Sequence, residues 1–309
     1  MATLQLDPAT LNAMRQLLQG KNRKWATPGD MAQHLDPDTI QTPALRLIDQ
    51  TLIDTTNMTD GRAIITLPPQ EGKSQRVSRR YPLWTLTHNP ATRIAIVSYS
   101  HAVARRWGRT IRDDITTHPD LGLTIRPDLS AQHEWQLAGA QGGVYTTGIG
   151  GSLTGRPVDL LIIDDPIKDR EQADSTIYRN RVWDWWTDVA STRLAPGAPV
   201  ILILTRWHQD DLAGRLLNAP DGHRWKLLNI PAQAETNNDP LGRKPGQWLQ
   251  SSRRRTTKQW EAIKQQAGSR TFNSLYQGHP SPPGGTIFNR EHWIIDPHPC
   301  LLYTSDAAD

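Results

Sequence analysis

Residues 61–74 read Gly-Arg-Ala-Ile-Ile-Thr-Leu-Pro-Pro-Gln-Glu-Gly-Lys-Ser, and this stretch decides the predicted fold. It begins with a short apolar run, Ala63 to Leu67, which is typical of a buried strand. The run gives way to a loop that ends in Gly72-Lys73-Ser74, and the residues from Gln75 to Pro82 can form a helix. A strand, a loop and a helix in this order form the setting of a phosphate-binding loop.

The last three residues of this loop would have separate tasks. Gly72 lets the backbone approach phosphate oxygens, while N–H groups at the helix N-terminus point at the anion. Lys73 would reach the β- and γ-phosphates, and the Ser74 hydroxyl would ligate Mg²⁺. Leu67 stands where the usual pattern has its first glycine, so the tripeptide alone leaves an ordinary helix start open.

The composition permits a polyanionic partner without requiring one. The chain has 309 residues, 37% of them hydrophobic, which is enough for one large α/β domain or two small ones. The formal charge is only +4, although basic residues gather at 76–80, 105–112 and 253–258. Each cluster also fits a solvated surface. The single cysteine, Cys300, excludes an intramolecular disulfide and a cysteine-based zinc site. With no signal peptide and no membrane-length apolar run, we expect an intracellular protein.

A second strand ends in a pair of carboxylates. Residues 158–163 form an almost unbroken apolar run, which is typical of a central parallel strand, and Asp164-Asp165-Pro166 follows. Ligands of open α/β sheets bind at this end of the strands. Two adjacent carboxylates raise each other's pKa unless a cation intervenes, and Mg²⁺ is the natural cation here. A solvated turn is the alternative.

A third buried strand, residues 199–204, ends in Thr205-Arg206-Trp207-His208. Thr205 can hydrogen-bond a phosphate or the attacking water, and Arg206 can sense the γ-phosphate. A structural salt bridge from Arg206 to Asp210 or Asp211 is the competing interpretation. The two aspartates are expected to open a short helix that ends at Leu217.

The other predicted elements alternate along the chain. Residues 1–60 read as helical, and 61–279 as the main α/β domain. Residues 280–299 have the Gly, Pro and Ser composition of a linker. Thr42-Pro43 and Ser251-Ser252 are expected to cap helices. The remaining strands are expected at 93–99, 135–137, 144–147 and 225–233, and the remaining helices at 101–115, 174–189 and 251–267.

Four pieces in one order resemble the ATPase domain of the large terminase subunits of tailed bacteriophages. They are Pro-Pro-Gln-Glu-Gly-Lys-Ser at 68–74, Gly-Arg-Pro at 155–157, Leu-Ile-Ile-Asp-Asp-Pro at 161–166, and Leu-Thr-Arg-Trp-His at 204–208 with Asp-Leu at 211–212. The resemblance covers about residues 40–295. It implies a RecA-like P-loop NTPase fold, α/β, with a mainly parallel central sheet flanked by helices. It also implies a motor that uses ATP and Mg²⁺ to push double-stranded DNA into a procapsid.

The resemblance also implies roles for single residues. Nucleotide would be bound by the loop residues Pro69, Gln70, Glu71, Gly72, Lys73 and Ser74. Ser74 and Asp164 would hold Mg²⁺, Asp165 would orient or deprotonate the attacking water, and Thr205 would couple hydrolysis to movement. Relatives often carry arginine where this chain has Gln70. The missing cation would therefore come from Arg76, from Arg206 or from a neighbouring subunit.

The family implies partners as well: a small terminase subunit, a portal on the procapsid, and a homo-oligomeric ring in the host cytoplasm, with no membrane. Whole members carry a nuclease domain after the linker, so we expect ATPase but not nuclease activity of this chain. Residues 300–309 are interpreted as adapter-derived sequence, with a genuine tail as the competing interpretation. The alternatives are another DNA-dependent P-loop ATPase such as a helicase, or a non-catalytic nucleotide- or DNA-binding remnant, as Leu67 and Gln70 suggest.

Overall fold

The computed structural model describes residues 25–153 and 155–280. Three sequence interpretations lie outside these residues: the helical spacing near residues 11–18, most of the linker at 280–299, and the adapter-derived character of 300–309. The domain boundaries therefore stay predictions.

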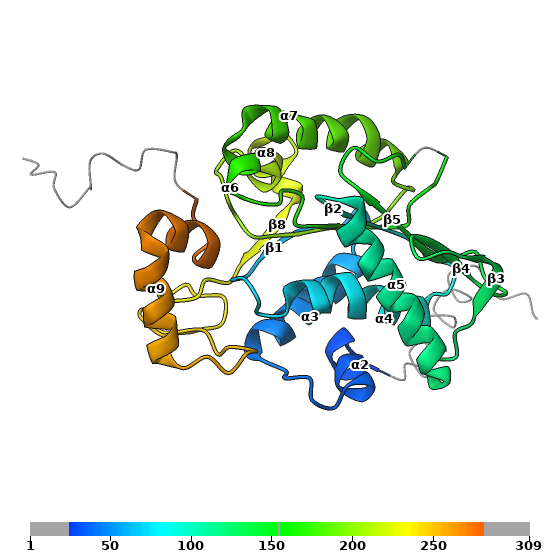
Figure 1. Ribbon diagram of the computed structural model, residues 1–309, viewed down its shortest axis with the longest axis horizontal. Coiled ribbons are helices and arrows are strands. Elements are labelled where there is room, and N and C mark those ends of the chain that lie inside the picture. The colour runs from blue at the N-terminus through cyan, green and yellow to red at the C-terminus, as the bar shows by residue number, and fades with distance from the viewer. Residues whose placement is uncertain (1–24, 154, 281–309) are drawn as a thin grey trace, which may run out of the picture.

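The core of the molecule is one eight-stranded, mainly parallel sheet with the strand order β3-β4-β5-β2-β6-β7-β1-β8 (Figure 1). Its parallel strands are β1 (Arg62–Thr66), β2 (Arg93–Ser98), β5 (Gly143–Gly148), β6 (Leu160–Asp164), β7 (Val200–Leu204) and β8 (Lys226–Asn229). The strands β3 (Ile125–Ser130) and β4 (Glu134–Leu137) run antiparallel at one edge. The predicted α/β class with a mainly parallel sheet is confirmed.

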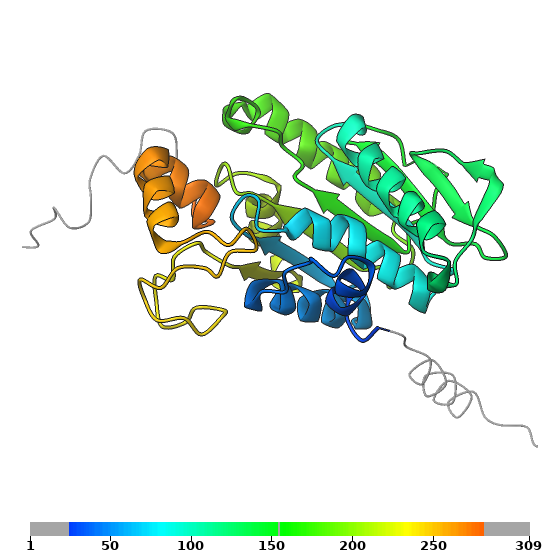
Figure 2. The same ribbon diagram turned by 60° about the horizontal axis from the view of Figure 1, so that its bottom comes forward.

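Helices cover both faces of this sheet, as parallel strands require. One face carries α2 (Pro28–Leu35), α3 (Pro43–Asn57), α4 (Tyr81–His88) and α5 (His101–Thr117), and the other carries α6 (Arg170–Asp174), α7 (Thr176–Asp184) and α8 (Leu212–Asn218) (Figure 1). Successive strand side chains alternate between the two cores, so Ile65 packs with the first group and Ile64 with the second. Both views place α9 (Thr257–Thr271) at the end of the molecule away from β3 and β4 (Figure 2).

Shorter helical turns complete the fold. In the part of the chain that the structure describes, three are π-helical, at Gln75–Arg80, Trp185–Ala190 and Phe272–Tyr276, and three are 3₁₀ turns, at Pro119–Leu121, Ser191–Arg193 and Gly222–Arg224. Within residues 25–153 and 155–280, no helix has both the length and the apolar character needed to cross a membrane.

The register of the central strands brings their carboxyl ends to one edge. Asp164 of β6 pairs with Ile203 of β7, and Leu204 of β7 pairs with Thr66 of β1. The residues that follow β1, β6 and β7 must therefore lie side by side. This register, rather than any local pattern, assembles the site described below.

Two helix predictions need correction. The helix after the phosphate loop does not end at Pro82, because the π-helical turn Gln75–Arg80 runs directly into α4. The Tyr81 N–H bonds to the carbonyl of Arg76, and Pro82 falls in the first turn of α4, where a missing N–H costs little.

Ser251 and Ser252 do not cap a helix either. The α9 helix begins at Thr257, and its N-cap is Thr256, whose hydroxyl accepts from the Gln259 N–H. The two serines instead bind Glu71, far away in the sequence. The Thr42 cap of α3 is confirmed, since its hydroxyl accepts from the Leu45 N–H at 3.2 Å.

Candidate active site

The loop between β1 and the π-helical turn has an unusual backbone. Gly72 has φ +92° and Gln70 has φ +66°, both in the left-handed region. A Cβ at Gly72 would meet nothing closer than 3.5 Å, so the backbone conformation rather than lack of space calls for glycine there. Gln70 has no such freedom, and holding it there costs about 1 kcal/mol or more. Strain of this kind is common where a loop is shaped for a ligand.

Lys73 meets residues from two other strands. Its Nζ donates to Asp165 Oδ2 at 3.0 Å and to Thr205 Oγ1 at 3.1 Å, and only 7% of the residue is exposed. The Thr205 N–H in turn donates to Asp165 Oδ1 at 2.7 Å. Three segments that lie far apart in the sequence thus place an amine, a carboxylate and a hydroxyl within hydrogen-bond distance.

Asp164 lies beside this group and is almost completely buried. It accepts from Ser74 Oγ at 2.9 Å and from Ser78 Oγ at 2.8 Å, one serine for each carboxylate oxygen. Burial, and then the charge of Asp165, raise the pKa of Asp164 to about 6, although Lys73 and the two hydroxyls oppose the shift. Lys73 and the two hydroxyls thus offset only part of the free-energy cost of burying the ionised Asp164 carboxylate.

The chemistry of this donor set fits Mg²⁺. The Asp164 carboxylate and the Ser74 hydroxyl are hard oxygen donors, and Mg²⁺ is usually held by one or two carboxylates together with waters and phosphates. A cation would also supply the charge that buried Asp164 lacks. Among the described residues, no group of three or more His, Cys, Asp or Glu could form a cage made only of protein ligands. Ser78 was missed from the sequence, although its place four residues after Ser74 in a helical segment was a usable signal.

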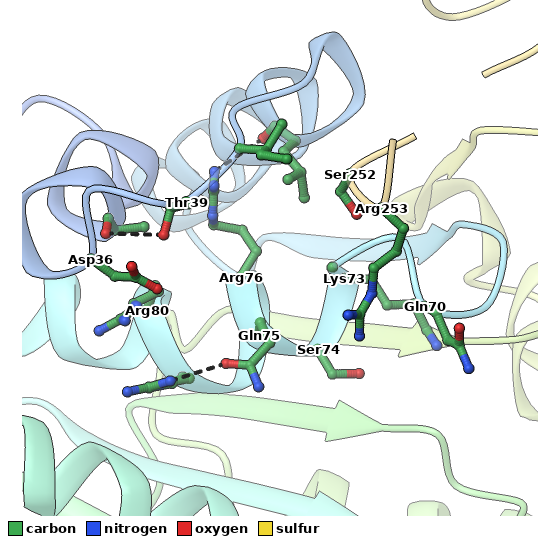
Figure 3. A pocket seen from close by; sticks show the side chains of 15 residues that line it. Asp36, Thr39, Gln70, Lys73, Ser74, Gln75, Arg76, Arg80, Ser252 and Arg253 are labelled. Atoms are coloured by element: carbon green, nitrogen blue, oxygen red, sulfur yellow. Dashed lines mark hydrogen bonds between the residues drawn. The ribbon is translucent and has the colours of Figure 1, made fainter. Parts of the chain in front are cut away.

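A cavity of about 510 Å³ opens beside the phosphate loop (Figure 3). This volume lies within the range of small-molecule sites. Lys73 and Ser74 line it on the loop side, Ile40 lines it from the segment that leads into α3, and Leu45 lines it from the first turn of α3. The other lining residues are Ala32, Asp36, Thr39, Gln70, Gly72, Gln75, Arg76, Arg79, Arg80, Ser252 and Arg253.

Glu71 points away from this chemistry and holds a distant loop. It is 2% exposed and accepts from Ser251 Oγ at 2.9 Å and from the Ser252 N–H at 2.8 Å. Arg255 forms an ion pair with the same carboxylate and donates to Gln70 Oε1 at 2.9 Å. The segment 251–255 is thereby fixed to the phosphate loop.

The two arginines predicted as alternatives for the missing loop cation are both engaged elsewhere. Arg76 is buried, forms an ion pair with Asp49, and donates to Gln41 Oε1 at 2.6 Å. Arg206 is also buried, and its Nε donates to Asp211 Oδ2 at 2.6 Å. The structure thus contains the structural salt bridge that competed with a γ-phosphate role for Arg206.

The structure therefore groups most of the predicted site. Lys73, Asp165 and Thr205 form one hydrogen-bonded group, and Ser74 and Asp164 form a second one directly beside it in the chain. Pro69, Gln70, Glu71 and Gly72 form the loop around it. Two predicted site residues have partners outside it: the Arg206 guanidinium is paired with Asp211, and the Glu71 carboxylate holds the segment 251–255.

Comparison with known proteins gives a family. The model of the family described as "Terminase large subunit, T4likevirus-type, N-terminal" matches residues 64–293. No curated protein matches. The crystal structure of the HK97 bacteriophage large terminase is similar with a TM-score of 0.53 and 16% identity, over 78% of this chain and 51% of that one. This chain thus spans about half the length of that terminase.

A second solved structure is similar over its whole length. A point mutant of the Thermus phage P74-26 large terminase ATPase domain has a TM-score of 0.50 and 11% identity, over 82% of this chain and 100% of that one. At such identities the structural likeness shows the fold alone, which is the RecA-like fold of terminase ATPase domains. The family model, however, covers well over half of the chain, so the chain belongs to the terminase large subunit family.

Proposed function

We propose that this chain is the ATPase part of a terminase large subunit, which hydrolyses ATP to ADP and phosphate and thereby moves double-stranded DNA into a procapsid. One observation carries the catalytic half of this proposal: the ends of β1, β6 and β7 bring Lys73, Asp164 and Asp165 together beside a nucleotide-sized cavity. Family membership supports the DNA-packaging half.

The nucleotide fits the cavity in one direction. Its phosphates would lie at Lys73 and at the N–H groups around Gly72, because these are the anion-binding groups of the loop. Its base would lie toward Ile40 and Leu45, the apolar part of the lining. Lys73 would then exchange its bond to Asp165 for one to a phosphate oxygen, which leaves Asp165 Oδ2 free to accept a proton from the attacking water.

Ser74 and Asp164 would hold Mg²⁺. When bound, the ion neutralises charge on the phosphate oxygens. Ser78 keeps the second oxygen of Asp164 in place. Thr205 bonds both Lys73 and Asp165, so it can report the state of the phosphates to β7, in agreement with a coupling role. Arg206 would contact the γ-phosphate only by leaving Asp211.

The wider setting of the proposal follows from the family. The chain would act as one subunit of a homo-oligomeric ring, with a small terminase subunit and the portal as partners, in the cytoplasm of the host cell. Nuclease activity belongs to a separate domain in this proposal, so we expect none from the residues that form the sheet.

The test is turnover of ATP by purified variants. Lys73→Ala and Asp164→Ala should each abolish Mg²⁺-dependent phosphate release, because they remove the phosphate cation and the metal carboxylate. Lys258→Ala is the matched control, since Lys258 is exposed on α9 and should leave turnover unchanged. Circular dichroism checks that the variants are folded. Normal turnover in either site variant would refute the assignment.

Two further measurements separate the alternatives. Processive separation of DNA strands by the chain alone would favour a helicase. Calorimetry that detects no Mg-ATP binding at millimolar nucleotide would favour a non-catalytic remnant.

A further inference from the structure

We infer that Arg253 supplies, from the same chain, the cation that contacts the terminal phosphate in this site. The inference rests on the proposed ATPase function, and it assigns the charge that neutral Gln70 does not provide. Three features of the structure support it: the position of Arg253 in the cavity lining, the contacts that hold its segment, and the ion pairs that engage the other cations of the lining. The charge that develops during ATP hydrolysis is the fourth argument.

Arg253 lines the nucleotide cavity from the side opposite α2. It belongs to the same lining as Gln70, Lys73 and Ser74. Figure 3 shows its side chain descending from the 251–255 segment toward the part of the loop that carries Lys73 and Ser74. A guanidinium there can reach a ligand held on the phosphate loop, although Arg253 is 180 residues further along the chain than Lys73.

The segment that carries Arg253 is anchored on both sides of it. Ser251 and Ser252 bind Glu71 on one side, and Arg255 binds Glu71 and Gln70 on the other. Arg255 also lies over the Trp260 ring at 5.2 Å, which ties the segment to α9. Because these contacts engage Arg255, they fix the backbone while leaving the Arg253 side chain free to bind a ligand. Preorganisation of this kind lowers the entropy lost on binding.

Every other cation in the cavity lining already has a carboxylate partner. Lys73 pairs with Asp165, Arg76 with Asp49, and Arg79 and Arg80 both with Asp114. Arg253 is exposed, and its guanidinium has no ion-pair or hydrogen-bond partner among the residues that the structure describes. Its backbone N–H donates to Ser251 Oγ at 3.0 Å, which helps to hold the segment and leaves the side chain available. It is thus the lining cation that can bind a phosphate without breaking an existing pair.

The reaction needs such a cation. A water oxygen bonds to the γ-phosphorus, the bond from that phosphorus to the bridging oxygen breaks with its electron pair going to ADP, and the water proton passes to Asp165. Negative charge spreads over the γ- and bridging oxygens in the transition state, and an arginine there accelerates turnover by roughly 10³–10⁵-fold in related phosphoryl transfers. Arg253 acts by charge and position and forms no covalent bond.

The experiment compares Arg253→Ala with the neighbouring control Arg254→Ala. Arg254 is exposed and does not line the cavity, so it matches Arg253 in charge and exposure. We expect Arg253→Ala to lower kcat by about 1,000-fold or more, the lower end of the range of arginine contributions, while the affinity for ADP changes less than about threefold. Arg254→Ala should retain kcat within about twofold, since a surface charge remote from the reaction contributes little. Arg253→Lys should recover part of the loss.

A second readout needs no turnover. Binding of ADP with Mg²⁺ and aluminium fluoride, which imitates the transferring phosphoryl group, should weaken in Arg253→Ala far more than binding of ADP alone. Equal weakening of both would show a general effect on binding and would overturn the inference.

A mixing experiment tests whether the arginine acts within its own chain. Arg253→Ala mixed with Lys73→Ala should stay inactive, because neither subunit holds a complete site. Recovery of turnover would mean that Arg253 serves a neighbouring subunit, which overturns the inference. Full kcat in Arg253→Ala together with loss in Lys73→Ala refutes only the role of Arg253. Full kcat in both variants refutes the proposed function itself.

Discussion

The buried ion pair between Asp49 of α3 and Arg76 of the π-helical turn gives the sharpest stability prediction. Asp49 is 1% exposed and Arg76 is 3% exposed, so neither charge is compensated by water. Asp49→Ala leaves the guanidinium buried with only the Gln41 amide oxygen and a weak contact to the Leu45 carbonyl as acceptors. Breaking one side of a buried pair costs about 3–5 kcal/mol. We expect the free energy of unfolding to fall by this amount.

The net contribution of the Asp49–Arg76 pair to the free energy of unfolding should be much smaller than the loss caused by removing Asp49 alone. Burial raises the pKa of Asp49 even with Arg76 beside it, and the Asp49 Oδ1 atom finds no partner among the described residues. The desolvation of the two charges is therefore only partly offset. Replacing both with apolar residues of similar size, Asp49→Leu with Arg76→Met, should cost no more than about 1–2 kcal/mol. The coupling between the two sites should accordingly be at least about 2 kcal/mol.

Urea unfolding followed by tryptophan fluorescence measures these values. With a slope of about 3 kcal/mol per molar, the single substitution should lower the midpoint by about 1–1.7 M. Asp38→Ala is the matched control, since exposed Asp38 accepts no side-chain bond among the described residues, and it should change stability by less than about 0.5 kcal/mol. A loss below about 1 kcal/mol for Asp49→Ala would contradict the prediction. So would additive effects of Asp49→Leu and Arg76→Met in their double variant.

Three more predictions concern single contacts. Ser78→Ala removes the bond to Asp164 Oδ2 and should raise the Mg²⁺ concentration for half-maximal turnover by about 10-fold; an unchanged Mg²⁺ titration would contradict this. Glu71→Gln weakens the anchoring of segment 251–255, so limited trypsin digestion should cut there sooner, and an equal rate would count against the anchor. Hydrogen bonding to Arg215, and then to Arg179, lowers the pKa of Asp210 from its ordinary 3.8 to about 2. Because the pKa of Asp210 is lower in the folded than in the unfolded chain, its ionised carboxylate stabilises the folded state at pH values above 3.8. This contribution is lost as the pH falls from 3.8 through about 2. Asp210→Asn should thus differ from the parent by a constant amount in neutral solution and by progressively less in acid, as pH-dependent urea midpoints will show; a constant difference down to pH of about 2 would rule it out.

Much of the fold could be predicted because its signals are local. The apolar runs that became β1, β6 and β7 need only be buried on both faces, and the Thr42 cap is set within four residues. The antiparallel strand β3 was missed because it lies at the sheet edge and none of its residues is buried, so its sequence carries little apolar alternation.

The errors in the helices have a physical cause of the same kind. A serine pair before a basic helix looks like a helix cap, yet Ser251 and Ser252 donate their hydrogen bonds to Glu71. No local sequence pattern reveals a partner so far away in the chain. Pro82 looks like a helix end, but the π-helical turn before it shifts the hydrogen bonds, so that the chain continues as α4.

For the candidate site, the amino-acid sequence was enough to predict the chemical groups: an amine in a glycine-containing loop, a hydroxyl beside it, and a carboxylate pair after a buried strand. The residue types and their immediate neighbours carry that information. The folded arrangement of the strands sets which of these groups meet, because strand register places Asp165 and Thr205 against Lys73. It also decided which arginines are occupied: Asp49 and Asp211 engage Arg76 and Arg206, while Arg253 faces the cavity. Partners of a long, charged side chain depend on packing across the whole molecule, which short sequence patterns do not encode.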